Sequence, residues 1–472
     1  MLDTSQSFKE NAAGAMANAG LQKALARAKP QFHAKRAYAV AAMPEFEQLR
    51  DEAKAIKDHT LSHLDHYLER YEAAVLASGG HVHWCKTAED ARATILKICR
   101  DAGAQTVTKG KSMVSEEIGL NEYLERHQVT PVETDLGEYI LQLRNEPPSH
   151  IIGPAFHLNR EDWEESFRKA HTDLPADRVF HERRDILTEA RIKLREKFLA
   201  ADVGITGANF LIAETGSSVI VTNEGNGDLT QTLPRIHIAL ATIEKIVPTI
   251  EDCLSLLRVL ARSATGQDMS VYTTFSTGGR RPGDLDGPQE YHVVLLDNGR
   301  SNMVGTEFQD MLRCIKCSAC MNHCPVYGAV GGHAYGSVYP GPMGSVLTPM
   351  LVGVEQAGLL PNASTFCGKC ESVCPVKIPL TGLMRHWRER EFERHLTPQT
   401  MRTGLGLWAF FAKRPALYRV ATRLAMAAMG LIGRKRGSFS SLPLAGGWTK
   451  GRDMPAPEGE TFFARYARSQ RS

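Results

Sequence analysis

The sequence predicts an α/β domain with a mainly parallel sheet, followed by a thiol-rich module and a basic C-terminal segment. Three observations lead to this prediction. Strand-like and helical segments alternate between residues 81 and 300, seven of the ten cysteines fall within 314–374, and residues 381–472 hold 17 Lys and Arg against 6 Asp and Glu. The chain has 472 residues and is 43% hydrophobic, so we expect about two to four domains with packed cores.

The first part of the chain, 1–70, is expected to form a helical arm. Residues 1–45 are rich in Ala, Lys and Arg with weak hydrophobic periodicity, which indicates a loosely packed helical segment. Residues 46–78 place apolar side chains at helical spacing, which predicts one or two amphipathic helices.

The α/β domain is expected over 71–300. Short β-rich segments bounded by polar residues predict strands at 81–85, 105–110, 130–135, 217–225 and 290–297. Helical periodicity predicts helices at 88–103, 115–128 and 249–264. Because strands that alternate with helices are joined by crossovers, we expect a mainly parallel sheet covered by helices.

Two polar stretches of this domain are candidates for a ligand site. In TKGKS (108–112), backbone amides with Lys109 and Lys111 are suited to a phosphate or a carboxylate. The second stretch, 204–228, contains Glu214, Thr215, Gly216, Asn223 and Glu224 around an apolar strand. These residues suit a small-molecule pocket at the carboxyl ends of strands, or else turns that join buried strands.

The thiol-rich module is expected over 301–385. CIKCSACMNHCP (314–325) has the spacing C-x2-C-x2-C-x3-C-P, in which three thiolates hold one four-iron cluster and the fourth cysteine binds a second cluster. Zinc is the rival ligand, because C-x2-C pairs also build zinc ribbons, and four unliganded core cysteines are a third interpretation.

A second run, STFCGKCESVCP (364–375), supplies the partner, with Ser364 at the position of its first thiol. Crossing the fourth ligands predicts a first cluster on Cys314, Cys317, Cys320 and Cys374, and a second on Cys324, Cys367 and Cys370. The remaining iron of the second cluster has several possible fates. Its ligand is Ser364, another side chain such as His323, His333 or a distant Cys, or else water or a substrate carboxylate. Alternatively this iron is absent, which leaves a three-iron cluster.

Two adjacent clusters form a path for single electrons, and they do not by themselves oxidise an organic molecule. We find neither a strand–GxGxxG–helix fingerprint nor a GxxxxGK[ST] loop, so a partner is expected to supply that chemistry. Two alternatives stay open: an enzyme whose open iron binds a hydroxy acid directly, and a redox-sensing binding module.

Together these segments resemble a known family. CIKCSACMNHCPVY, GGHAYGSVYPGPMGSVLTP and CGKCESVCPVKIP closely resemble the lactate utilisation protein B (LutB) family, the iron–sulfur subunit of the LutABC system. GITGANFLIAETGSSVIVTNEGN resembles the LUD domain, and WTKGRDMP with FFARY resembles the LutB-type C-terminal domain, placed at 386–472.

The resemblance implies a LUD domain similar to sugar-isomerase and coenzyme A-transferase folds, then an α-helical ferredoxin-type module with two [4Fe-4S] clusters. It implies electron transfer during oxidation of L-lactate to pyruvate, together with LutA-like and LutC-like subunits. The resemblance also implies that the absence of a thiol at the position of Ser364 is usual in that family. No catalytic residue is implied.

The basic tail and the N-terminus suggest where the protein works. The tail mixes Arg with Trp, Phe and Leu, which suits docking on an acidic partner or a membrane surface better than nucleic-acid binding, because no nucleic-acid module accompanies it. The N-terminus has no basic start followed by an apolar run, and no stretch reaches the roughly 18 apolar residues of a membrane span. We therefore expect a cytoplasmic protein.

Overall fold

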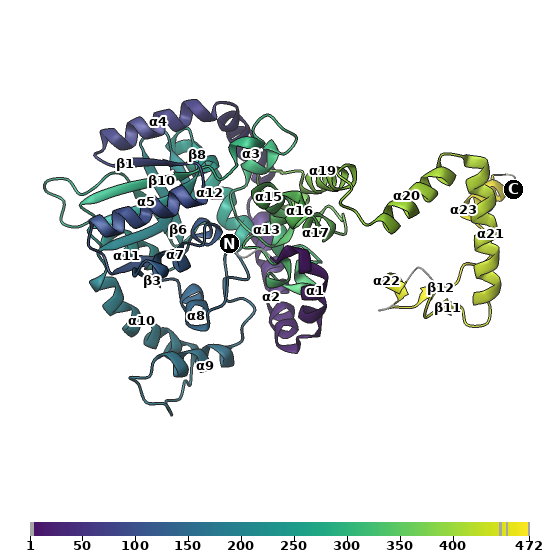
Figure 1. Ribbon diagram of the computed structural model, residues 1–472, viewed down its shortest axis with the longest axis horizontal. Coiled ribbons are helices and arrows are strands. Elements are labelled where there is room, and N and C mark those ends of the chain that lie inside the picture. The colour runs from purple at the N-terminus through teal and green to yellow at the C-terminus, as the bar shows by residue number, and fades with distance from the viewer. Residues whose placement is uncertain (1–3, 443–445, 450–451, 471–472) are drawn as a thin grey trace. The chain divides into compact units, whose positions relative to one another are not determined.

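The computed structural model describes residues 4–442, 446–449 and 452–470 (Figure 1). Lys450 and Gly451 of the WTKGRDMP segment lie outside the described residues. By backbone contacts the chain divides into two compact units, Met1–Glu391 and Phe392–Ser472. The helical arm, the α/β domain and the thiol-rich module of the sequence analysis all belong to the first unit, which therefore contains all seven clustered cysteines.

The centre of the first unit is a six-stranded sheet in which every neighbouring pair is parallel. Its strands, in spatial order, are β1 (His81–Cys85), β10 (Glu290–Leu296), β7 (Ile236–Thr242), β4 (Val203–Gly207), β2 (Thr106–Lys109) and β3 (Thr130–Glu133). All residues of β7 are buried, because helices or a second sheet cover both faces of a parallel sheet. The expected parallel sheet is confirmed.

Alternate residues of the central strand β7 enter different cores. Ile236, Ile238 and Leu240 of β7 pack in one core, with residues of α5 (Ala88–Asp101), α6 (Met113–Glu117) and α7 (Leu120–Arg126). Ala239 and Ala241 pack in the opposite core, with α4 (Leu64–Ala77). The single helix expected at 115–128 is interrupted at Gly119, whose φ of 61° is incompatible with a continuous right-handed helix.

A second sheet of four strands lies beside the first. Its spatial order is β8 (Ile246–Val247), β5 (Phe210–Ile212), β6 (Ser217–Thr222) and β9 (Tyr272–Ser276). The segment 217–225, expected in the parallel sheet, instead forms β6, which runs antiparallel to β5. The reason is local: Gly216, with a φ of 70°, turns the chain back immediately after β5, so no crossover helix intervenes.

The remaining helices of the α/β domain surround these sheets. They are α8 (Leu136–Arg144), α9 (Arg160–Ala170), α10 (Arg183–Ala200), α11 (Asn226–Thr232) and α12 (Ile250–Ala264). Helices α8, α9 and α10 share a small core around the fully buried Phe167. Helix α12 packs against α3 (Phe46–Ser62) in the core that also includes the thiol-rich module.

The N-terminal helices α1 (Phe8–Ala17) and α2 (Ala19–Ala41) contact α12 and the short helices of the thiol-rich module, although more than half of their residues are exposed. Ala24, Leu25 and Ala39 of α2 are buried. Arg36 donates to the carbonyl oxygen of Val373 at 3.2 Å, and further along Arg50 of α3 donates to that of Cys374 at 2.7 Å. Small side chains and backbone-directed arginines pack well without producing hydrophobic periodicity.

Between residues 301 and 385 the chain forms short helices and no strand. They are α13 (Ala319–Asn322), α14 (Tyr327–Val330), α15 (Gly341–Val352), α16 (Val354–Ala357), α17 (Leu359–Asn362) and α18 (Lys369–Val373), followed by α19 (Leu380–Glu393). Glycines in this region allow two backbone segments to lie close together. At Gly344, for example, a Cβ would lie 1.5 Å from the carbonyl oxygen of Tyr339.

The second unit has helices and a pair of strands of its own. They are α20 (Gln399–Ala412), α21 (Pro415–Gly433), α22 (Gly446–Thr449), α23 (Phe462–Ser469) and an antiparallel pair, β11 (Ser438–Phe439) with β12 (Met454–Pro455). Trp408, Leu424 and Ile432 are exposed. In the part of the chain that the structure describes, every helix is too short or too polar to cross a membrane.

Candidate metal centre and neighbouring cavity

Four thiols from both cysteine runs surround one space. Cys314, Cys317 and Cys320 of the first run and Cys374 of the second line the same cavity, and most of the other lining side chains are apolar, among them Met321, Met343 and Leu380. Among the residues that the structure describes, no three His, Cys, Asp or Glu side chains lie close enough together to hold a single metal ion. The four thiols are instead arranged around a shared volume.

The two cysteine runs have the same backbone shape. Lys316 and Ser318 of the first run have left-handed φ values of 58° and 61°, and the equivalent residues of the second run, Phe366 and Gly368, have 54° and 74°. These conformations are uncommon for residues other than glycine, so they mark a constrained loop. Each loop leads directly into a short helix, α13 or α18.

Backbone amides in these loops donate to the cysteine sulfurs. The N–H of Lys316 donates to Cys314 Sγ at 3.4 Å, and the N–H of Ile378 donates to Cys374 Sγ at 3.4 Å. Such bonds stabilise negative charge on sulfur, and in iron–sulfur proteins they tune the reduction potential. The loops therefore suit thiolates that bind a metal cluster.

Three of these thiols, those of Cys317, Cys320 and Cys374, have a raised pKa and are difficult to ionise in the absence of a metal. Burial raises the pKa of Cys374 to about 11, and burial followed by the neighbouring Cys317, Cys314 and Cys374 raises the pKa of Cys320 well above its usual range. Metal ligands must be deprotonated, and a bound cation supplies the positive charge that makes this favourable. The residues present thus fit a metal cluster held by several thiolates.

The other three clustered cysteines form a second group. Burial, followed by the neighbouring Cys324, raises the pKa of Cys370 to about 12. Cys367 is exposed, and its pKa is lowered, mainly by the N–H of Lys369. The second group therefore reaches the protein surface, whereas Cys317, Cys320 and Cys374 of the first group are largely enclosed.

Ser364 lies in the second run where the first run has Cys314. Its Oγ accepts a hydrogen bond from the N–H of Phe366 at 3.2 Å, the same bond that Cys314 Sγ accepts from Lys316. The serine oxygen thus takes the place of a sulfur in an otherwise equivalent loop.

The two histidines considered as replacement ligands make other contacts. His323 Nδ1 donates to the carbonyl oxygen of Ala319 at 3.0 Å, its ring stacks on that of His33, and burial lowers its pKa to about 4. His333 Nε2 donates to the carbonyl oxygen of Pro147 at 2.8 Å.

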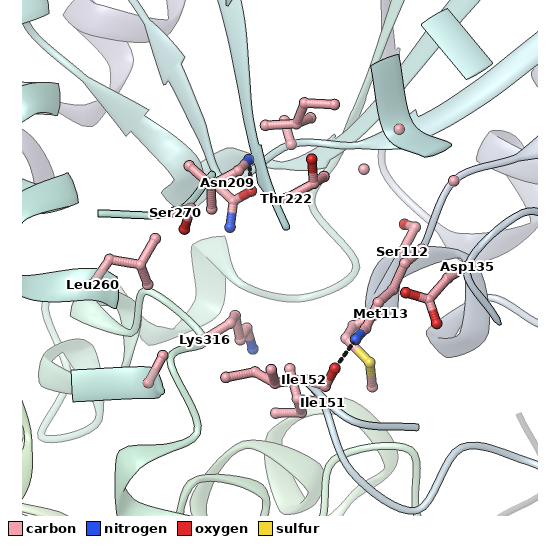
Figure 2. Close-up of a pocket in the computed structure, with 18 of the residues that line it drawn as sticks. Ser112, Met113, Asp135, Ile151, Ile152, Asn209, Thr222, Leu260, Ser270 and Lys316 are labelled. Atoms are coloured by element: carbon pink, nitrogen blue, oxygen red, sulfur yellow. Dashed lines mark hydrogen bonds between the residues drawn. The ribbon is translucent and has the colours of Figure 1, made fainter. Parts of the chain in front are cut away.

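A larger cavity of about 290 Å³ lies at the carboxyl ends of strands β2, β4 and β6 (Figure 2). Its lining includes polar side chains from the ends of these strands, from the loops that follow them and from the region before β9, among them Ser112, Asn209, Thr222 and Ser270. Ile151, Lys316 and Cys317 line both this cavity and the four-thiol cavity. The two cavities therefore share a wall, and we call the larger one the sheet-end cavity.

Three lysines line the sheet-end cavity. Lys111 donates to the carbonyl oxygen of Ile152, and the Lys316 ammonium lies 4.2 Å from the centre of the Tyr339 ring. Lys245 is only 5% exposed, and burial lowers its pKa to about 8. Its ammonium group has no hydrogen-bond or ion-pair partner among the described residues. Sequence reasoning missed Lys245 and Lys316, although Lys316 lies inside the first cysteine run.

Among the candidate ligand-binding residues predicted from the sequence, Asn223 and Glu224 line the sheet-end cavity. Lys109 does not, because its buried ammonium pairs with Glu133 at 2.7 Å and Glu116 at 3.0 Å.

Glu214, Thr215 and Gly216 form the turn between β5 and β6, away from the cavity lining. Thr215 Oγ1 bonds Ser217 Oγ at 2.7 Å, and a Cβ on Gly216 would lie 2.6 Å from the backbone nitrogen of Val75. For these three residues the structure agrees with the interpretation as a turn.

Family models match three successive parts of the chain. The model described as "LUD domain" matches residues 68–296, "4Fe-4S dicluster domain" matches 310–378, and "Lactate utilisation protein B, C-terminal" matches 386–471. A LUD domain is therefore followed by an iron–sulfur domain, in the order expected from the sequence.

Curated relatives match over nearly their full length. "Lactate utilization protein B" of Bacillus licheniformis is 42% identical over 97% of this chain and 95% of its own. The protein of the same name from Macrococcus caseolyticus is 46% identical over 88% and 87%. The "Uncharacterized electron transport protein YkgF" of Escherichia coli is 41% identical over 95% and 94%. The chain belongs to the lactate utilisation protein B family.

Proposed function

We propose that this chain is the iron–sulfur electron-transfer subunit of a system that oxidises L-lactate to pyruvate. The observation that carries the proposal is the four-thiol cavity built from both cysteine runs, in a chain that belongs to this family. The names of the relatives refer to lactate utilisation and, in one case, to electron transport. Neither name favours a sensor or an enzyme that binds the hydroxy acid at an open iron.

The proposed ligands follow the grouping of the thiols. Cys314, Cys317, Cys320 and Cys374 would hold one [4Fe-4S] cluster, and Cys324, Cys367 and Cys370 would hold the second, with Ser364 beside its remaining iron. When bound, such clusters accept and release single electrons. The chain contributes thiolates, N–H donors to sulfur and an apolar enclosure, all of which set the reduction potential.

The exposure of the second group suggests where electrons are exchanged with a partner. Cys367 is exposed, so the second cluster would lie near the surface that LutA-like or LutC-like subunits approach. The arginines of the second unit, together with its exposed apolar side chains, suit docking on an acidic partner or a membrane surface. This arrangement fits a cytoplasmic subunit of a larger assembly.

Two measurements test the proposal. Protein purified without oxygen should be brown and contain about eight irons, or about seven if the second cluster lacks one, with reducible signals in electron paramagnetic resonance. Deletion of the gene should abolish growth on L-lactate but not on pyruvate, and the wild-type gene should restore it. A colourless protein that contains zinc, or unchanged growth on L-lactate, would contradict the proposal.

A further inference from the structure

We propose that the sheet-end cavity binds a small carboxylate anion directly beside the thiols of the first cluster. The first reason is Lys245. Its side chain is nine-tenths buried, lines the cavity, and has no partner for its ammonium group among the described residues. A buried charge without a partner is costly, so an anion in the cavity would supply the missing interaction.

A comparison with a second buried lysine shows that Lys245 is unusual. Lys57 is as deeply buried, but its ammonium donates to the carbonyl oxygens of Glu244 at 2.5 Å and Ile246 at 3.3 Å. Lys57 does not line the cavity. A lysine of this protein can therefore be buried and still have hydrogen-bond partners.

The charges around the cavity favour an anion near Lys245. Lys316 lies close enough to Lys245 to repel its charge, and the neighbouring Glu244 is already engaged by Arg300 at 3.2 Å and Thr242 at 2.8 Å. Of the two acidic side chains that line the cavity, Glu224 lies near Lys111 and near the other one, Asp135. Lys245 and Lys316 thus share one side of the cavity, where the nearby Glu244 attracts them but forms its ion pair with Arg300.

The volume of the cavity and the side chains that lie opposite Lys316 indicate the class of carboxylate. A volume of about 290 Å³ is at the lower end of the range for ligand pockets, which suits a small metabolite. Figure 2 shows Asn209, Thr222 and Ser270 across the cavity from Lys316. Amide and hydroxyl groups suit a second polar group on the ligand, so a short hydroxy or oxo acid fits best.

The wall shared by the two cavities would let a ligand in the sheet-end cavity influence the first cluster. Because Cys317 and Lys316 line both cavities, a bound carboxylate would place negative charge next to a thiolate ligand of the first cluster. Negative charge stabilises the oxidised form, so binding should lower the potential of that cluster. The class of ligand follows from the cavity, whereas the choice of L-lactate and pyruvate as probes rests on the proposed function.

A simpler role for Lys245 must be distinguished, namely a fixed counter-ion for the cluster thiolates. Both roles predict that loss of the charge shifts the potential of the first cluster. Only the binding role predicts a dependence on added carboxylate.

The experiment is calorimetric titration of the full-length protein, purified without oxygen and without partner subunits, with L-lactate, pyruvate and inorganic phosphate. We expect L-lactate or pyruvate to bind, and Lys245→Met to weaken binding about 10- to 100-fold, as expected for loss of a charge-assisted hydrogen bond. Ser270→Phe, which fills the cavity from the opposite wall, should also abolish binding. Lys369→Met is the matched control, because it removes an exposed lysine beside the other thiol group.

Iron content and the paramagnetic signals of each variant establish that it is folded. The bound carboxylate should shift the signal of one cluster in the wild type and not in Lys245→Met. Binding of phosphate alone, no binding of any probe, or equal binding by Lys245→Met would overturn the proposal. Because no partner or turnover is involved, these results are independent of the growth test of the proposed function.

Discussion

At the scale of single residues, Ser364 is the point where the two otherwise equivalent cysteine loops differ. The backbone around it has the same left-handed residues as the first loop, and its Oγ accepts the hydrogen bond that Cys314 Sγ accepts there. The second loop therefore places a hydroxyl oxygen where the first loop has a ligand sulfur. A hydroxyl is a weaker ligand for iron than a thiolate, because it resists deprotonation.

Restoring sulfur at this position should complete the second cluster. Ser364→Cys is expected to raise the iron content of a three-iron cluster, or to change the paramagnetic signal of a cluster with an open iron, since the loop geometry already suits a thiolate. Ser372→Cys is the matched control, because that serine donates to the carbonyl oxygen of Lys369 and lies exposed on α18. An unchanged spectrum for Ser364→Cys would mean that another ligand already occupies the place.

Removing one enclosed thiol should remove one cluster. Cys317→Ala takes a ligand from the four-thiol cavity, and we expect loss of about half of the iron with loss of one paramagnetic signal. Cys253→Ala is the control, because Cys253 is buried in the same core but outside both cysteine runs. If Cys317→Ala keeps both signals, the proposed assignment of ligands is incorrect.

At the scale of elements, a buried ionic network joins the α/β domain to the thiol-rich module. Arg300, which follows β10, donates to Glu117 of α6 at 2.6 and 2.9 Å and lies 3.2 Å from Glu244. Tyr339, just before α15, donates to Glu117 at 2.6 Å. Burial would raise the pKa of Glu244, but Arg300 and other cations outweigh it and hold the value at about 2.

Breaking this network should destabilise the first unit strongly. Arg300→Met leaves two buried carboxylates without their main partner, and we expect a loss of roughly 3–5 kcal/mol near pH 8. Arg258→Met is the control, because Arg258 forms a half-exposed pair with Glu45 and should cost less than about 1 kcal/mol. Urea unfolding of the cluster-loaded protein measures both.

The cost of Arg300→Met should fall as the pH falls. In the wild type the lowered pKa of Glu244 contributes stability that is complete above its ordinary value and is lost only as the pH falls towards about 2. In the variant, burial without the arginine raises the pKa of both carboxyls, so they take up protons at mild acidity and the penalty shrinks. The difference in urea midpoint should therefore be larger at pH 8 than at pH 5.5, and the reverse order would contradict this account.

Helix α15 depends on one glycine. A Cβ at Gly344 would lie 1.5 Å from the carbonyl oxygen of Tyr339, so Gly344→Ala should prevent correct folding of the thiol-rich module and reduce cluster content. In α20, by contrast, a Cβ at Gly404 meets no atom within 4 Å. Gly404→Ala should be neutral or stabilising by up to about 1 kcal/mol. Normal iron content in Gly344→Ala would show that the backbone can move apart at low cost.

At the scale of the whole molecule, the division after Glu391 separates the cysteines from the basic unit. A chain that ends at Glu391 should keep its iron and both cluster signals, because all proposed ligands and the buried residues of α19 lie before that point. It should nevertheless fail to support growth on L-lactate if the second unit docks the subunit on its partner. Full growth with the truncated chain would contradict the docking role, and loss of iron would show that the first unit is not independent.

The sequence by itself determined the features that depend on local spacing. The C-x2-C-x2-C-x3-C-P run, the serine at 364 and the alternation of strands with helices are readable because a tight loop or a regular element involves residues close together in the chain. The boundaries of β1, those of β10 to within one residue, and the parallel sheet followed from the same local patterns.

Only the tertiary structure decided which distant groups meet. It packed α2 against the cysteine runs and placed Lys245 and Lys316 on one side of the sheet-end cavity, whereas the grouping of Cys374 with Cys314, Cys317 and Cys320 was already predicted from the two runs. It also excluded Lys109 and Glu214 from that cavity. The physical reason is that a cavity and an unpartnered charge arise where separate elements pack, and no spacing along the chain records which side chains remain without a partner there.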